Sequence, residues 1–215
     1  MGGKRTHGKH AAEVLLSYTQ TTRLGYRPEA IVRVTNFEFV FSLFSVMLGF
    51  SLAEVLGGFA RALRHRRSAP VGWLTPLLGL FVILDLLSFW ETAWGARTHV
   101  QPQYGFLVVI AASAATYYLA ASLVFPAHVT DLHDYDEHFF EHRRQILAAV
   151  AFWHVVGSIW LFYLVGSLPM VVMATLASYY VLLAVAFVSK MKALTTGSLM
   201  LLCGIYLVTA VSSLC

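Results

Sequence analysis

The chain has 215 residues, of which 58% are hydrophobic and only 12% are charged, and its formal net charge is +4. A typical soluble domain is about 25% charged, and a soluble chain could not bury this much apolar surface. The basic excess does not indicate nucleic acid as a partner, because the Lys and Arg residues cluster in short flanks that suit anionic lipid headgroups. The composition therefore predicts an integral membrane protein in a lipid bilayer.

Residues 1–35 form a basic segment ahead of the first apolar run. The stretch 11–18 is compatible with a short amphipathic helix, and Pro28 is expected to end any helix before it. We interpret residues 1–35 as a flexible or membrane-surface tail, and a specific lipid-binding anchor is the alternative. Its six basic residues are Lys4, Arg5, Lys9, Arg23, Arg27 and Arg33.

Residues 36–215 are expected to form a single transmembrane domain. As helices, its apolar runs are long enough to cross the ~30 Å hydrocarbon core of a bilayer. The segment 126–145 between the third and fourth runs is acidic and rich in histidine, and we interpret it as an interfacial helix or an extension of the fourth span. The predicted fold class is all-α, a polytopic bundle with spans at about residues 37–62, 73–95, 104–125, 146–166, 169–189 and 194–214.

Small residues recur along one face of the first span. This pattern lets a second helix backbone approach closely, and it predicts a homo-oligomer. The residues are Ser42, Ser45, Gly49, Ala53 and Gly57.

The connections between the spans differ in basic charge. Those after the first, third and fifth spans carry four (counting Arg61), two and two Lys or Arg, whereas those after the second and fourth carry one and none. Positive residues favour the cytoplasmic side, so the loops 63–72, 126–145 and 190–193 are predicted to be cytoplasmic. The basic tail argues for the opposite orientation, and the three loops outweigh it because they agree.

This topology makes a labelling prediction. Single cysteines at Ser68 and Gln101, in a background lacking Cys203 and Cys215, are expected to react from opposite sides of the membrane. Impermeant maleimide added to intact cells should label position 101 and spare position 68. Labelling of position 68 alone would invert the topology.

Acidic residues inside apolar spans are costly, at about 2.5–3.5 kcal/mol for a central Asp, and often mark function. Asp85 lies deep in the second span. At 100° per residue it shares one side of a helix with Ser88, Glu91 and Thr92, which suits a hydrated ion pathway. The alternative for Asp85 is a hydrogen-bonded contact between helices. Glu54, in the first span, is expected to pair with Arg61 or Arg64, or to bind a cation.

His154 is the only histidine deep within a span, and Ser158 follows one turn later. A single buried histidine usually forms a structural hydrogen bond, and it cannot supply the two axial imidazoles of a b-type haem. The two cysteines of the chain are too few for an iron–sulfur cluster. No cofactor is predicted, and His154 remains a candidate for the ion pathway.

His138, Glu141 and His142 match the H-x-x-E-H spacing of inverted zinc peptidases. On a helix both imidazoles would lie on one face. The match fixes only three positions in a segment dense in histidines and acids, where chance matches are frequent. The sequence therefore predicts no bound metal, and these three residues are the candidate ligands if that prediction fails.

The segments TYYLAA at 116–121 and SYYVLLA at 178–184 are alike. An inverted repeat of three spans would pair the third span with the sixth, not with the fifth, so we interpret the likeness as coincidence.

Two function classes follow from these observations. The first is a small channel or transporter for protons or cations that uses Asp85, Glu91 and Glu54. The second is a non-catalytic membrane subunit or sensor whose cytoplasmic loop binds a protein partner. A metal-dependent membrane enzyme ranks third, and a non-enzymatic role is favoured because no nucleophile motif or phosphate-binding loop is visible.

Overall fold

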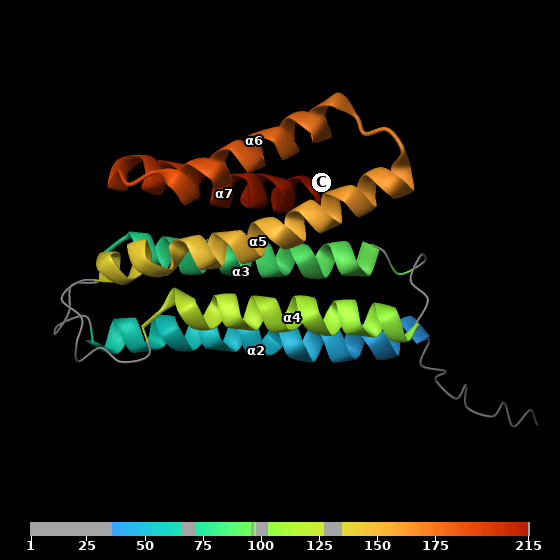
Figure 1. Cartoon of the computed structure of the whole chain (residues 1–215), viewed down its shortest axis with the longest axis horizontal. Helices are drawn as coiled ribbons and strands as arrows, with labels where there is room; N and C mark the ends of the chain where they lie inside the picture. The colour runs from blue at the N-terminus through green and yellow to red at the C-terminus, as the bar shows by residue number, and fades with distance from the viewer. Residues whose placement is uncertain (1–35, 66–71, 96, 98–102, 127–134, 215) are drawn as a thin grey trace, which may run out of the picture. The chain divides into compact units, whose positions relative to one another are not determined.

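The computed structural model describes residues 36–65, 72–95, 97, 103–126 and 135–214, with only the backbone given for Asn36, Leu164 and Val165. The described residues form six α-helices and no strand, which confirms the all-α fold class (Figure 1). Each helix is long and apolar enough to cross a membrane, so the chain is a multi-pass membrane protein. The helices are α2 (Asn36–His65), α3 (Leu74–Gly95), α4 (Tyr104–Val124), α5 (Tyr135–Val165), α6 (Met170–Val188) and α7 (Lys192–Ser212).

Local sequence signals explain several helix ends. Helix α4 stops before Phe125, whose extended backbone is the conformation that the following Pro126 favours. Helix α5 stops at Gly166, which has a φ of 75° and donates its N–H to the Phe162 carbonyl at 2.9 Å. Glycine reaches this left-handed conformation without a Cβ clash. Pro169 then precedes the first turn of α6.

The helix of the fourth span begins earlier than predicted. It was predicted to begin at residue 146, but α5 runs without a break from Tyr135. With 31 residues it is about 46 Å long, which exceeds the ~30 Å hydrocarbon core. Of the two interpretations of residues 126–145, the described part is therefore an extension of the span. Thr75 of α3 donates a 2.8 Å hydrogen bond to the Tyr135 carbonyl and fixes this extension to the bundle. The basic tail and residues 127–134 lie outside the described residues.

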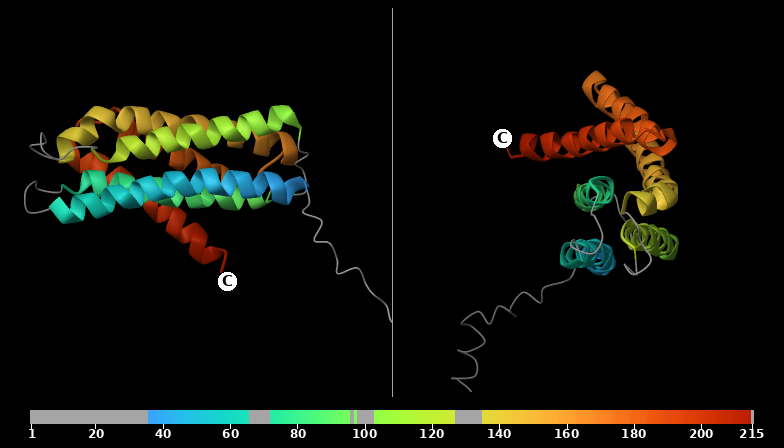
Figure 2. Two further views of the ribbon diagram at one scale, coloured as in Figure 1. Left: turned by 90° about the horizontal axis from the view of Figure 1, so that it is seen from below. Right: turned by 90° about the vertical axis from the view of Figure 1, so that its left-hand side faces the viewer.

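Helix α3 is the most enclosed of the six. It packs against α2, α4, α5 and α7, while α2 also lies along α4, and α6 pairs with α7 (Figures 1 and 2). Its buried face includes Leu78, Phe81 and Val82, each fully removed from solvent. A polar side chain on this face is therefore held among several helices at once.

The small-residue face of α2 points away from the neighbouring helices. Ser42, Gly49 and Ala53 are exposed, whereas Phe44 and Leu48 on the opposite side are buried. A Cβ added at Gly49 would meet nothing within 4 Å. This face is open to lipid or to another chain, and the homo-oligomer stays a prediction.

Candidate functional site

Asp85 lies at the centre of a buried polar cluster. Its side chain is 0% exposed, and its Oδ1 atom lies 2.6 Å from His154 Nε2 of α5 and 2.6 Å from the Tyr206 hydroxyl of α7. Such short distances are typical of hydrogen bonds in which one partner carries a charge. One carboxyl oxygen thus joins α3 to α5 and α7.

Two tyrosines extend this contact. The Tyr206 hydroxyl also lies 3.1 Å from His154 Nε2 and 3.2 Å from the Tyr179 hydroxyl of α6. The Tyr179 ring packs against the His154 imidazole with 4.4 Å between ring centroids. The Tyr206 hydroxyl faces both Asp85 and Tyr179 as a donor, and because a phenol has a single proton it can donate to only one of them at a time. Four helices therefore share one hydrogen-bond network.

The second carboxyl oxygen of Asp85, Oδ2, has no hydrogen-bond partner among the described residues. The hydroxyl of Tyr117 on α4, which is 1% exposed, makes no hydrogen bond of good geometry within the described part of the chain either, but it lies close enough to the Asp85 carboxyl to interact with it. Buried polar atoms without a partner are costly, and they are common at functional sites. We name the five residues Asp85, Tyr117, His154, Tyr179 and Tyr206 the Asp85 cluster.

The members of the Asp85 cluster differ in exposure. Asp85 and Tyr117 are enclosed, whereas the His154 side chain is 24% exposed and Tyr206 is half-buried. One turn beyond His154 on α5, Ser158 shares a 2.8 Å hydrogen bond with the Tyr180 hydroxyl of α6. The side of the cluster formed by α5 and α7 is thus the more exposed one, while Tyr179 of α6 is buried, and α5 and α6 carry a further polar pair.

The other predicted pathway residues lie elsewhere. Ser88 donates to the Asp85 backbone carbonyl and Thr92 to that of Ser88, both at 2.9 Å, so these hydroxyls bond to their own helix. Glu91 and Thr92 are exposed. Glu54 forms a 2.9 Å ion pair with Arg61, one of the two partners that the sequence suggested. Of the six predicted pathway residues, only Asp85 and His154 meet through their side chains.

Sequence reasoning missed the three tyrosines of the Asp85 cluster. Tyr117 and Tyr179 are the first residues of the two Tyr-Tyr pairs that were set aside as coincidence, and both are buried beside Asp85. Tyr206 is the only tyrosine of α7. A search for buried phenols on every span would have found these residues, because a hydroxyl in an apolar span needs a partner.

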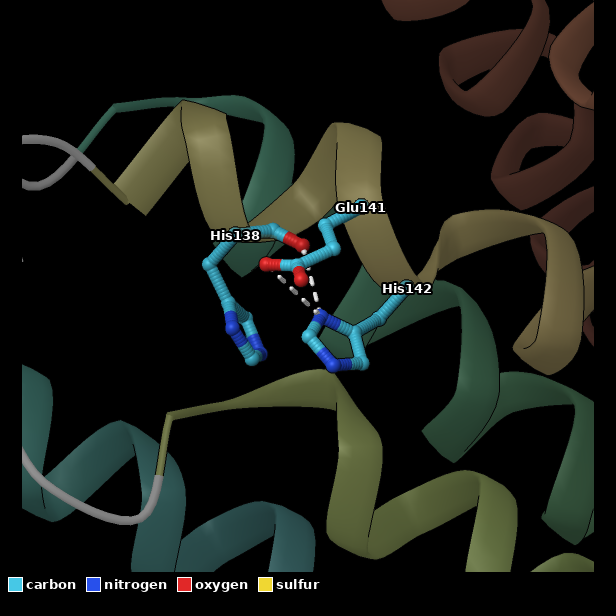
Figure 3. Close-up of side chains that lie close together, drawn as sticks. All are labelled: His138, Glu141 and His142. Carbon is cyan, nitrogen blue, oxygen red and sulfur yellow. Dashed lines mark hydrogen bonds and ion pairs between the residues drawn. The ribbon is translucent and has the colours of Figure 1, made fainter.

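The H-x-x-E-H residues form a second polar group, near the start of α5. His138 and His142 are half-buried, Glu141 is exposed, and one ligand atom from each lies within 4.8 Å of the others (Figure 3). Helix α5 thus contributes to two candidate sites, and His142 of one lies about three helical turns before His154 of the other.

Comparisons with protein-family models, with curated proteins and with solved structures give no match. The function is therefore inferred from the chemistry of the described residues.

Proposed function

We propose that this multi-pass membrane protein carries protons across the bilayer and that the Asp85 cluster binds them. The observation that supports this most is the fully enclosed Asp85 carboxyl, bonded at 2.6 Å to an imidazole and to a phenol from two other helices. Carboxyl and imidazole groups are the usual members of proton relays in membrane proteins.

The donor set favours a proton over a metal cation. Ca²⁺ and Mg²⁺ take about six to eight oxygen ligands, many of them anionic or carbonyl oxygens. The Asp85 cluster offers one carboxyl, three phenol hydroxyls and an imidazole, and Asp85 Oδ1 already accepts two hydrogen bonds. A proton needs only one lone pair and no cavity, so it fits an enclosed carboxyl.

A route to Asp85 begins at His154. Its Nε2 atom contacts the carboxyl, and its side chain is the more exposed of the two. An imidazole can take up a proton at one nitrogen and release another from the second nitrogen. Proton uptake would change the donors and acceptors along Tyr179, Tyr206 and Asp85. Because these residues lie on three helices, the change would favour a different packing of α3, α6 and α7.

The non-catalytic subunit or sensor remains the second candidate, and the complete enclosure of Asp85 favours it. In that role the Asp85 cluster is a permanent polar contact that fixes the mutual arrangement of the helices. Such a contact needs no exchange of protons with water.

Proton flux into liposomes separates these roles. A potassium diffusion potential should drive protons through the wild-type protein, as reported by an entrapped pH dye. Asp85→Asn keeps the shape and most hydrogen bonds of the side chain but removes the titrating group. We expect its flux to fall to that of protein-free liposomes.

The matched control is Glu91→Gln, which removes an exposed carboxyl from the same helix and should keep the wild-type rate. Circular dichroism and the amount of inserted protein must agree among all three samples. If wild type shows no flux, or if Asp85→Asn equals wild type, the subunit role replaces the proposal. If Asp85→Asn abolishes potassium flux instead, the carried ion is a metal cation.

A further inference from the structure

His138, Glu141 and His142 lie on the same side of α5, one turn apart, with Glu141 exposed and the two histidines half-buried. Residues at i, i+3 and i+4 of a helix are neighbours on its surface. One ligand atom from each of the three lies within 4.8 Å of the others, and the two imidazole rings stack with 4.3 Å between centroids. Figure 3 shows the three side chains gathered on one side of the helix.

Each imidazole already makes a hydrogen bond through one ring nitrogen. Nε2 of His138 lies 3.0 Å from the carbonyl of Leu123, at the end of α4, and Nδ1 of His142 lies 3.2 Å from the carbonyl of His138. A carbonyl only accepts, so both nitrogens donate an N–H in these bonds. The other nitrogen of each ring, Nδ1 of His138 and Nε2 of His142, then holds the lone pair that a metal would need. This is the usual state of a metal-binding histidine, whose second nitrogen donates to a carbonyl or carboxylate.

The nearby cations face other helices. Arg143 donates to Thr195 of α7 and stacks over Phe140, and the guanidinium of Arg144 lies over the Phe187 ring of α6. Neither arginine has an ion pair with Glu141 among the described residues. Glu141 Oε2 instead lies 3.8 Å from Nδ1 of His142, the nitrogen that donates to the His138 carbonyl. Because the Glu141 side chain is 73% exposed, solvent weakens this contact, and the carboxylate can exchange it for a metal ion.

We propose that His138, Glu141 and His142 bind a zinc-type divalent transition metal through two imidazoles and one carboxylate. Imidazole ligands select against Mg²⁺ and Ca²⁺. Three protein ligands of the His₂Glu type leave one position of a tetrahedral Zn²⁺ open to water or to a ligand. Zn²⁺–ligand bonds of about 2.0–2.2 Å place the ligand atoms of a tetrahedral site ~3.4 Å from one another. The ligand atoms of the three side chains must therefore move closer together when the metal binds, which rotation of the side chains allows. The spacing alone could not show this arrangement, because it does not set the direction of the rings.

Metal titration of the full chain, purified without a histidine tag and stripped with EDTA, tests this site. Zn²⁺ is added in competition with a chromophoric chelator, and wild type is expected to bind one equivalent. The variants His138→Ala and His142→Ala should each weaken binding by at least ~100-fold, since even residues that only orient a ligand are worth about 10–100-fold. Co²⁺ in place of Zn²⁺ should give the visible absorption of a four- or five-coordinate ion.

His65→Ala is the control, because His65 is a half-buried histidine of α2 that also bonds to a carbonyl, that of Arg61. It should leave the affinity unchanged. Glu141→Gln alters only an exposed side chain, so it reports on binding even if the histidine variants fail to fold. Absence of Zn²⁺ binding by wild type overturns the proposal. The proposal is also overturned if Glu141→Gln, and those histidine variants that fold, keep the wild-type affinity for Zn²⁺ and the wild-type Co²⁺ spectrum.

Discussion

Replacing His154 with leucine is expected to destabilise the protein, by about 3–5 kcal/mol if the imidazole is protonated, which is the usual cost of removing one partner of a buried ion pair. Asp85 is 0% exposed and would keep only the Tyr206 hydroxyl as a hydrogen-bond donor. An ordinary hydrogen bond between membrane helices is worth much less, about 0.6 kcal/mol on average. The size of the effect therefore reports whether the contact carries charge. Reversible unfolding in mixed detergent micelles, followed by tryptophan fluorescence, measures it.

A double-variant cycle shows whether the cost comes from Asp85. Asp85→Asn removes the charge and keeps the shape, so His154→Leu should cost clearly less in the Asp85→Asn background than in wild type. His65→Leu, which removes a histidine of α2 outside the Asp85 cluster, should change stability by less than about 1 kcal/mol. Equal costs of His154→Leu in both backgrounds would contradict an electrostatic coupling between the two residues.

Gly58→Ala should also destabilise the protein, by about 1–3 kcal/mol or more, as overpacking does in a close-packed core. A Cβ at position 58 of α2 would overlap the ring of Phe125 and lie 2.8 Å from the Cβ of that residue. The ring cannot turn away freely, because it also packs against Phe59 with 4.9 Å between centroids. The same unfolding measurement, together with size-exclusion chromatography, would detect the loss of packing.

Gly49→Ala is the matched control on the same helix, because a Cβ there would meet nothing within 4 Å. Its stability should stay within about 0.5 kcal/mol of wild type. Replacing Phe125 with alanine in the Gly58→Ala protein should remove the overlap, so the two changes should cost less together than their sum. Equal stability of Gly58→Ala and Gly49→Ala would show that α2 and the end of α4 do not pack as described.

The two candidate sites differ in how much of their arrangement could be predicted from the sequence. Glu141 and the two histidines are neighbours in sequence, so helix periodicity alone brings them to one face. Asp85 and His154 were each visible as ionisable residues in apolar spans, but they are 69 positions apart. The polar strip of Ser88 and Thr92 was predicted to face a hydrated pathway. Serine and threonine often bond to the preceding turn instead, as these two do.

The sequence by itself determined the class of protein, the number of spans and most of their ends, and it limited the partners of Glu54 within its own helix to Arg61 or Arg64. These properties depend on the length and apolarity of single segments, on prolines and glycines, and on contacts within one helix. Only the tertiary structure decided that Asp85 meets His154 and Tyr206, residues 69 and 121 positions away. That meeting depends on how helices rotate and pack against one another, and no pattern within one span specifies it.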